Sequence, residues 1–301
     1  MKKTNFYGLA AFVALSLGVS FSSCTTKVDP NAGKIDPSTI ATSDLVAYFP
    51  FNGTGNDSIT GLTPTAKPGV TYVTGRRGMA FKGADNAYFL YNLPTGSKLK
   101  TLKAFSVAMW LNEPQIPNEQ SPVPIIMQIG NDDDYFWGNL TLTQDRMGSA
   151  SAPIDSLNLK AVFHSQTAVW QNQFVNFPNP ALQASKWIHL IFEYNNVTSS
   201  FNVYVNGVLL TGVLASKWTP RYADVAPATG VQPPFGDMVF NKANTLVFGG
   251  WLTKILQNPP ATDTWMGWFN GTMDELRIYD RALTGTEAKN LYDAEVTQLN
   301  K

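Results

Sequence analysis

Alternation of apolar and polar residues recurs along most of this chain. In residues 105–112, FSVAMWLN, apolar side chains fill every second position, which is the period of a strand with one buried face. Residues 123–129 form a mostly apolar run, which predicts a strand covered on both faces. Segments 186–194 and 200–205 predict a hairpin, and Asn206-Gly207 then favours a tight type I′ turn into a further strand.

Helical patterns are scarce. The best one begins at Thr284, which can cap free backbone amides, and Glu287 stands three residues later, as a capping box requires. Leu291 and Tyr292 follow at helical spacing and are expected to dock on the rest of the protein. Many short strands with Gly and Pro turns and little helix predict a β-sandwich or barrel.

Two segments near the ends of the chain are the most informative. Residues 45–51, LVAYFPF, precede a Gly- and Asn-rich loop that ends at Asp57, and residues 269–283, FNGTMDELRIYDRAL, contain Asp274. Together with GMAFKG at 78–83, the strand 105–110 and the hairpin 187–207, they resemble the LamG-like jelly roll of the concanavalin A-like lectin/glucanase superfamily.

That resemblance implies an all-β, two-sheet antiparallel jelly-roll sandwich with a short C-terminal helix. Its first and last strands would pair and close one domain over residues 45–301. Segments 112–185 and 217–244 resemble the family less and are expected to be insertions or long loops.

The N-terminal residues have the pattern of an export signal. Lys2 and Lys3 precede an apolar run over residues 6–19, which is shorter than the ~20 residues that a transmembrane helix needs. Small residues then lead to Cys24, as in a bacterial lipobox. We therefore predict a lipoprotein signal peptide at 1–23, lipidation of Cys24 and a flexible tether at 24–44; an unprocessed leader with an unused thiol is the alternative.

The leader resembles that of lipoproteins of the Bacteroidetes type, which suggests a cellular location for this protein. They imply anchoring in the outer membrane through lipid, with the domain exposed at the cell surface. Cys24 is the single cysteine, so no disulfide can form within one chain.

Composition adds a constraint on partners. The formal net charge is zero, which gives no electrostatic footprint for nucleic acid. Charged residues make up only 15% and aromatic residues 12%, against a usual charged share of ~25%. A surface of this kind suits stacking on sugar rings or packing against another protein.

The family resemblance also suggests a structural calcium ion. Jelly rolls of this kind often tie the first loop to the last strand with calcium, which prefers carboxylate and carbonyl oxygens. Asp57 and Asp274 would be the carboxylate ligands, with oxygens of Asn52 and Gly53 completing the site. The alternative is that Asp57 makes an Asx-turn and Asp274 accepts hydrogen bonds from backbone amides. The acidic run 131–134 is either a solvated turn or a second calcium site.

Catalysis finds little support in the motifs. The superfamily's hydrolases carry a Glu-x-Asp-x-x-Glu strand, which we do not find, and the sequence contains no G-x-S-x-G, H-E-x-x-H or Walker loop. His189 lies in a predicted strand and is expected to be packed there. The sequence therefore favours binding, with a glycoside hydrolase or lyase as an alternative.

Four tryptophans in polar or Gly- and Pro-rich surroundings could form a sugar platform: Trp137, Trp170, Trp218 and Trp265. The stretch 168–174 is the strongest candidate, because Gln171 and Asn172 stand beside Trp170. The alternative is that these rings cover the core beneath long loops. Trp110 and Trp187 lie in predicted strands and are expected in the core.

The resemblance thus implies a lipid-anchored carbohydrate-binding protein that assists glycan capture at an outer-membrane importer of the SusC/SusD kind. An accessory lipoprotein of such an importer, acting through protein or peptide contacts, is the alternative non-catalytic function.

Overall fold

The computed structural model describes residues 36–116, 121–146, 155–164, 172–210 and 234–297. These residues belong to one compact unit, Ile35–Lys301. Within them, no helix is both long and apolar enough to cross a membrane.

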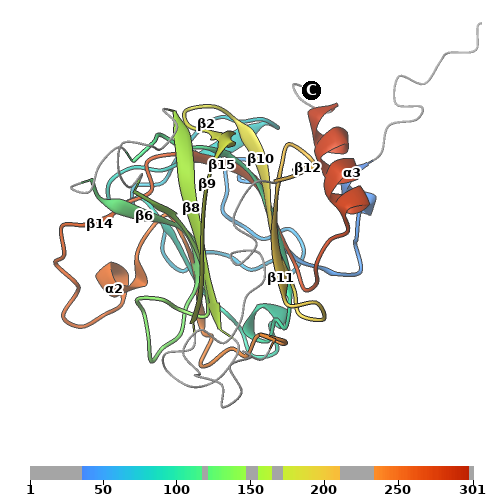
Figure 1. Ribbon diagram of the computed structural model, residues 1–301. Coiled ribbons are helices and arrows are strands. Elements are labelled where there is room, and N and C mark those ends of the chain that lie inside the picture. Colours follow the sequence, from blue (N-terminus) through green and yellow to red (C-terminus); the bar gives the residue numbers. More distant parts are fainter. Residues whose placement is uncertain (1–35, 117–120, 147–154, 165–171, 211–233, 298–301) are drawn as a thin grey trace, which may run out of the picture. The chain divides into compact units, whose positions relative to one another are not determined.

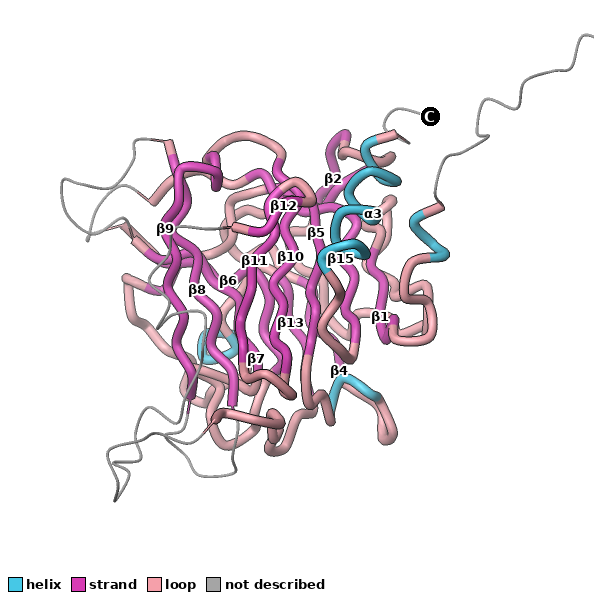
Figure 2. Tube along the Cα trace, turned by 45° about the vertical axis from the view of Figure 1, so that its right-hand side comes forward, coloured by secondary structure: helices cyan, strands magenta, loops and turns pink. Residues whose placement is uncertain are grey.

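Two β-sheets make up the described part of this unit (Figures 1 and 2). The first has the strand order β12-β11-β10-β5-β15-β3-β2, and β1 also pairs with β15. Its strands are β1 (Leu45–Phe49), β2 (Thr71–Thr74), β3 (Met79–Lys82), β5 (Phe105–Asn112), β10 (Ile188–Asn195), β11 (Ser200–Val205), β12 (Val208–Leu209) and β15 (Thr272–Tyr279). We call it the eight-stranded sheet.

The second sheet has the order β4-β13-β6-β7-β8-β9, with β14 beside β6. Its strands are β4 (Phe89–Asn92), β6 (Val123–Ile129), β7 (Leu140–Asp145), β8 (Ser156–His164), β9 (Asn172–Gln183), β13 (Thr245–Phe248) and β14 (Met266–Gly267). We call it the seven-stranded sheet. The pairings in both sheets are antiparallel, apart from the short parallel pairing of β14 with β6. The predicted fold class, a two-sheet jelly-roll sandwich with a short C-terminal helix, is confirmed.

The two ends of the domain pair through β15. Along one edge of β15, Phe49 of β1 lies opposite Leu276, and Phe81 of β3 lies opposite Met273. The other edge pairs with β5, with an irregularity between Asp274 and Arg277. Glu275 stands there at φ 54°, as expected for a β-bulge. The predicted pairing of the first and last strands is therefore confirmed.

The main core fills the space between the sheets. Aromatic rings dominate it near β1, where Phe49 lies 4.8 Å from Phe248 and Phe51 lies 5.6 Å from the same ring, both edge-on. Such edge-to-face pairs are favoured by the ring quadrupole. Every residue of β6 is buried, which confirms the expectation that both of its faces are covered.

Helices cover the outer face of each sheet (Figure 1). Helix α3 (Gly285–Val296) packs Leu291 onto the eight-stranded sheet, in a cluster with Ile191 and Tyr279. Thr284 and Glu287 form the predicted capping box. On the other side, the short helix α2 (Leu252–Ile255) lies against the seven-stranded sheet and packs Leu252 onto Val247.

The segment before β1 also contacts α3. A single 3-10 turn, η1 (Pro37–Thr39), is capped by the Asp36 carboxylate, which accepts from the Ser38 amide at 2.9 Å. Ile40 is buried in the cluster beneath α3. Residues 36–44, which the sequence assigns to the tether, thus pack in part on the domain.

One expectation about loops was wrong. We expected residues 112–185 to be an insertion or long loops beyond the single strand 123–129, but β7, β8 and β9 form a large part of the seven-stranded sheet. The physical reason is visible in the alternation: Leu140 and Leu142 of β7 and Leu159 of β8 lie in the core between polar neighbours in the sequence. This region resembles the family only weakly, so its alternation of apolar and polar residues was not interpreted as strands.

Candidate functional site

A pocket of about 390 Å³ opens at one end of the sandwich. It lies where β3 and β5 end and β15 begins, and β14 and the far end of β7 complete it from the seven-stranded sheet. Lys82, Asn112 and Thr272 are in register across three neighbouring strands. This shared register brings residues 85–86, 113–116 and 266–270 to one place, although they are far apart in the sequence.

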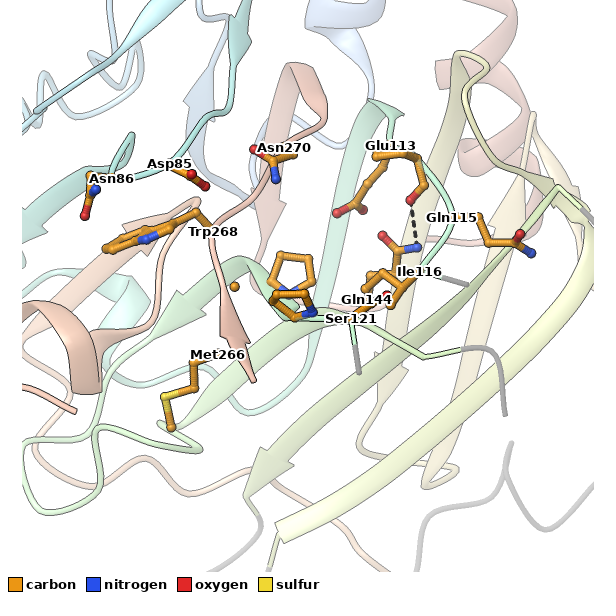
Figure 3. Close-up of a pocket in the computed structure, with 14 residues that line it drawn as sticks. Asp85, Asn86, Glu113, Gln115, Ile116, Ser121, Gln144, Met266, Trp268 and Asn270 are labelled. Atoms are coloured by element: carbon orange, nitrogen blue, oxygen red, sulfur yellow. Dashed lines mark hydrogen bonds between the residues drawn. The ribbon is translucent and has the colours of Figure 1, made fainter. Parts of the chain in front are cut away.

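Glu113 lies at the inner wall of this pocket (Figure 3). It follows the last residue of β5 and precedes Pro114, which cannot continue the strand ladder. Its backbone carbonyl accepts from the Ser185 amide at 2.7 Å. The side chain is only 1% exposed, and neither carboxyl oxygen has a hydrogen-bond partner within the described part of the chain.

Burial raises the pKa of Glu113 to about 8, because desolvation disfavours the charged form. The side chain is therefore mostly protonated at neutral pH, and it can donate one hydrogen bond and accept others.

Gln144 of β7 faces Glu113 across the end of the core (Figure 3). Its Nε2 donates to the carbonyl of Pro114 at 2.9 Å, which joins the two sheets at this point. The Oε1 atom is buried and has no partner among the described residues. Two adjacent side chains of the pocket thus hold unpaired polar atoms, each of which costs free energy unless a ligand or water satisfies it.

Trp268 supplies an aromatic wall. Its ring is stacked on Tyr88, with centroids 5.8 Å apart and planes 11° apart. Tyr88 is not among the residues that line the pocket, so it supports the indole from outside. Gly250 allows this placement, because a Cβ at that position would lie 2.7 Å from the indole ring.

Carboxylate and amide side chains surround the opening. Asp85 and Asn86 occupy the turn between β3 and β4, and Asn270 precedes β15; Asp85 and Asn270 are exposed. The Gly83 amide donates to the carbonyl of Gly271 at 3.0 Å and thereby ties the two segments together. Among the described residues that line the pocket, none is Lys, Arg or His. The described lining of the pocket therefore combines one aromatic ring with hydrogen-bonding groups and no cation.

Two of the predicted platform tryptophans meet on the outer face of the seven-stranded sheet. The Phe136 ring lies 4.3 Å from Trp137 and 5.6 Å from Trp265, and Trp251 completes this outer aromatic group at 5.3 Å from Phe136. Both predicted tryptophans are partly exposed. The Lys160 ammonium lies 5.1 Å from the Trp137 ring centre, a cation–π distance.

The remaining predicted ligand residues are less defined. Trp170, Gln171 and Trp218 lie outside the described residues, as does Cys24. Asn172 opens β9 opposite His164. Of the predicted core tryptophans, Trp110 is buried and Trp187 is partly exposed just before β10.

Sequence reasoning missed both Glu113 and Trp268. Glu113 has the pattern of a solvated residue at a strand end, and its burial depends on Gln144 and residues 266–270, which are distant in sequence. Trp268 stands in Gly-Trp-Phe-Asn-Gly, a sequence context like that of the four tryptophans predicted to form a sugar platform. The one sequence feature that could have indicated Glu113 is its position between a predicted strand and a proline.

The predicted calcium ligands in the first loop are hydrogen-bonded. Oδ1 of Asp57 accepts from the amides of Tyr48 at 2.8 Å and Ile59 at 2.9 Å, and Oδ2 accepts from Thr60. The Asn52 Oδ1 atom accepts from the Met79 amide at 2.7 Å. Gly53 turns the chain at φ 73°. These contacts are the Asx-turn and amide bonds that the alternative to calcium predicts.

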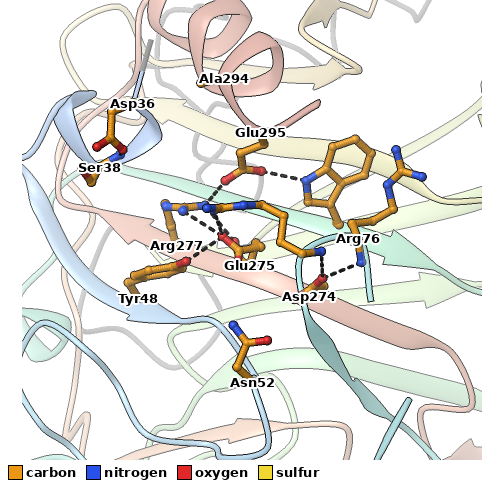
Figure 4. Close-up of polar contacts among 12 residues, drawn as sticks. Asp36, Ser38, Tyr48, Asn52, Arg76, Asp274, Glu275, Arg277, Ala294 and Glu295 are labelled. Atoms are coloured by element: carbon orange, nitrogen blue, oxygen red, sulfur yellow. Dashed lines mark hydrogen bonds and ion pairs between the residues drawn. The ribbon is translucent and has the colours of Figure 1, made fainter. Parts of the chain in front are cut away.

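Asp274 is placed by the turn between β2 and β3. Its Oδ2 accepts from the amides of Arg76 at 2.7 Å and Arg77 at 3.0 Å (Figure 4), and burial raises its pKa to about 7. Donor N–H groups thus point at Oδ2, whereas Oδ1 is buried and has no hydrogen-bond partner among the described residues. Among the described residues, no three His, Cys, Asp or Glu side chains are grouped so as to hold a metal ion. The calcium site predicted at Asp57 and Asp274, with oxygens of Asn52 and Gly53, stays a prediction.

A buried ion network lies beside Asp274, beneath α3 (Figure 4). Arg277 pairs with Glu295 of α3 and, at 3.0 Å, with Glu275. Tyr48 of β1 donates to Glu275 at 2.6 Å, and the Trp110 indole donates to Glu295 at 2.7 Å. The network therefore joins the first strand, the last strand and the C-terminal helix.

Comparisons with known proteins place the fold. No protein-family model and no curated protein matches the chain. Among solved structures, the binding domain of Paraclostridial Mosquitocidal Protein 1 is 12% identical with a TM-score of 0.55, over 84% of this chain and 52% of that chain. A botulinum neurotoxin type C structure, whose description reports that cell entry depends on two ganglioside molecules, is 13% identical with a TM-score of 0.56, over 85% and 52%.

The binding domain of botulinum neurotoxin DC, solved with rat synaptotagmin II, is 12% identical with a TM-score of 0.54, over 85% of this chain and 52% of that chain. Our chain thus spans about half the length of these structures. At such identities the likeness shows a shared all-β fold.

The Glu113→Gln variant tests the protonation of the pocket wall. The folded protein holds the Glu113 proton up to about pH 8, whereas the unfolded chain releases it near the ordinary value of 4.5. The unfolded state therefore binds fewer protons between these values, and stability falls as pH rises. Relative to wild type, Glu113→Gln should gain melting temperature steadily from pH 5 to pH 8.

Glu193→Gln is the matched comparison, because burial raises the pKa of Glu193 only to about 6. The gain in melting temperature of Glu193→Gln over wild type should level off near pH 6. Melting curves of the two variants that run parallel to wild type at every pH would contradict the assignment.

Removal of Arg277 tests the buried network. Arg277→Leu leaves the buried Glu295 carboxylate without its arginine and Glu275 with Arg77 as its remaining arginine, which should lower the free energy of unfolding by about 3–5 kcal/mol in urea titrations. Lys289→Ala removes an exposed ion pair with Asp293 on the same helix and should change it by less than about 0.5 kcal/mol. Equal effects of the two substitutions would show that the network contributes little.

A melting experiment with EDTA separates the two explanations of Asp57 and Asp274. If calcium ties the first loop to the last strand, chelation lowers the melting temperature and added calcium restores it. If the hydrogen bonds suffice, the melting temperature does not change, while Asp57→Ala still lowers it because several backbone amides lose their acceptor.

Proposed function

We propose that this protein binds carbohydrate in the pocket at the end of the sandwich. The observation that carries this proposal is the placement of the Trp268 ring beside the unpaired polar atoms of Glu113 and Gln144. Sugar rings have an apolar face that stacks on aromatic rings, and their hydroxyl groups supply the missing hydrogen bonds. A pocket with one aromatic wall and a few convergent polar groups is typical of small-ligand sites.

The structural neighbours are consistent with a binding role. The description of the type C neurotoxin names gangliosides, which are glycolipids, as the molecules on which entry of that toxin depends. Shared fold alone does not determine function, so the pocket of this chain carries the argument.

The wider setting of the proposal comes from the sequence. A lipid on Cys24 would anchor the protein in the outer membrane, and a surface-exposed domain would capture glycans for an importer of the SusC/SusD kind. The alternative is an accessory lipoprotein that contacts such an importer or a peptide. The DC neurotoxin domain was solved with a protein partner, and the outer aromatic group of Trp137 and Trp265 is the surface that such a contact would use.

A hydrolytic function has one supporting observation. Glu113 and Asp85 are two carboxyl groups that line the same pocket, and a glycosidase needs one protonated and one ionised carboxyl group. Release of oligosaccharides from a bound polysaccharide would establish this alternative over simple binding.

The Trp268→Ala variant tests the proposed site. Wild-type protein is screened against a panel of plant, fungal and bacterial polysaccharides, and the tightest oligosaccharide is then titrated calorimetrically. Trp268→Ala should weaken binding at least about tenfold, because loss of stacking costs on the order of 1.4 kcal/mol.

Trp265→Ala is the matched control, since Trp265 is a partly exposed neighbour in sequence that does not line the pocket. Its binding should equal that of wild type. Loss of binding in Trp265→Ala or Trp137→Ala, with Trp268→Ala unaffected, would move the site to the outer aromatic group. If the wild type binds no glycan in the panel, the proposed function is contradicted.

A further inference from the structure

We infer that the pocket is selective for an uncharged, hydroxyl-rich sugar, with Glu113 recognising it as a protonated acid. This inference rests on the proposed function and names its ligand class. It begins from two side chains, Glu113 and Gln144, that are 1% and 0% exposed, line the pocket and keep oxygens without partners in the described part of the chain. Figure 3 shows the Glu113 carboxyl group directed into the space between Trp268 and Gln144.

The unpaired atoms specify what a ligand must offer. A protonated Glu113 has one O–H donor and a carbonyl acceptor, and Gln144 Oε1 is an acceptor only. A ligand that satisfies all three has one acceptor and two donors close together. Two neighbouring sugar hydroxyls provide this set, because each hydroxyl donates once and also accepts.

Three cations near the pocket donate to backbone carbonyls of residues that line it, and the Lys254 ammonium lies 5.8 Å from the Trp268 ring centre. Lys82, Lys254 and Arg146 donate to the backbone carbonyls of Asn270, Met266 and Ser121 at 2.7, 2.6 and 2.8 Å. None of these three cations is among the described lining residues.

The other charged groups on neighbouring elements are few. Asp85 lies on the opposite wall of the pocket, and Lys186 and Asp155 stand near Ser185, behind the Glu113 backbone. Burial is the one cause that raises the pKa of Glu113. Among the described lining residues, no cation is therefore available to hold the Glu113 carboxylate in its charged form.

This distribution of charge disfavours ionic ligands. The carboxylate of a uronic acid would meet Asp85 and the acid of Glu113, with no cation among the described lining residues to pair with, and burying an unpaired charge is costly. A neutral sugar keeps Glu113 protonated, so its affinity would fall as pH rises above 8.

The test is calorimetric titration of the tightest neutral oligosaccharide and its uronic-acid counterpart at pH 6 and pH 9.5. Only the fraction of the protein in which Glu113 is protonated binds the neutral sugar tightly. At pH 9.5, about 1.5 units above the Glu113 value, the apparent affinity should therefore fall roughly thirtyfold. The uronic acid should bind at least about tenfold more weakly than the neutral sugar at pH 6.

Variants separate the protonated acid from other roles. Glu113→Gln keeps a donor and an acceptor and should bind the neutral sugar about equally at both pH values. Glu113→Ala should bind weakly at both. Glu193→Gln removes a different buried carboxyl group and should retain the wild-type pH profile.

Three results would overturn the inference while leaving the function in place, provided that Trp268→Ala loses binding. They are a flat pH profile in wild type, equal binding of the uronic acid, and loss of all binding in Glu113→Gln. If the wild type binds no glycan at either pH, the proposed function fails and the inference fails with it.

Discussion

The pairing of β15 with three other strands is the constraint on which the rest of the structure depends. β5 lies along one edge of β15, and β1 and β3 share the other. This arrangement closes the sandwich between segments more than two hundred residues apart. It also brings the ends of β3 and β5 and the start of β15 to a common level, and the pocket opens at that level. A loss of this register would remove the site together with the fold.

Buried polar groups in this protein differ in whether other side chains satisfy them. Arg277 is enclosed with carboxylates, a phenol and an indole that satisfy one another, so the network is explained by its own contacts. Glu113 is equally buried but has no such partners among the described residues. Proteins generally satisfy their buried polar atoms. The Arg277 network therefore joins elements of the fold, and the contrast with Glu113 agrees with our proposal that Glu113 contacts a ligand.

Sequence patterns predicted the parts of the fold that depend on local chemistry. The capping box at Thr284 and the turn at Asn206-Gly207 follow from neighbours in the chain, and the structure confirms them. Residues 105–112 form the predicted strand with alternate apolar residues in the main core, but residues 105–111 are buried on both faces. The site could not be predicted in this way. Glu113 is buried only because β7 and residues 266–270 cover it, and those contacts are absent from any local window. Trp268 has no sequence feature that separates it from the other exposed tryptophans.

The most direct test of this account is a crystal structure of the protein with a neutral oligosaccharide that it binds. The account predicts a sugar ring against the indole of Trp268, with two hydroxyl groups within hydrogen-bond distance of Glu113 and Gln144. A sugar seated instead on the outer aromatic group around Phe136, with nothing bound between Trp268 and Glu113, would contradict it.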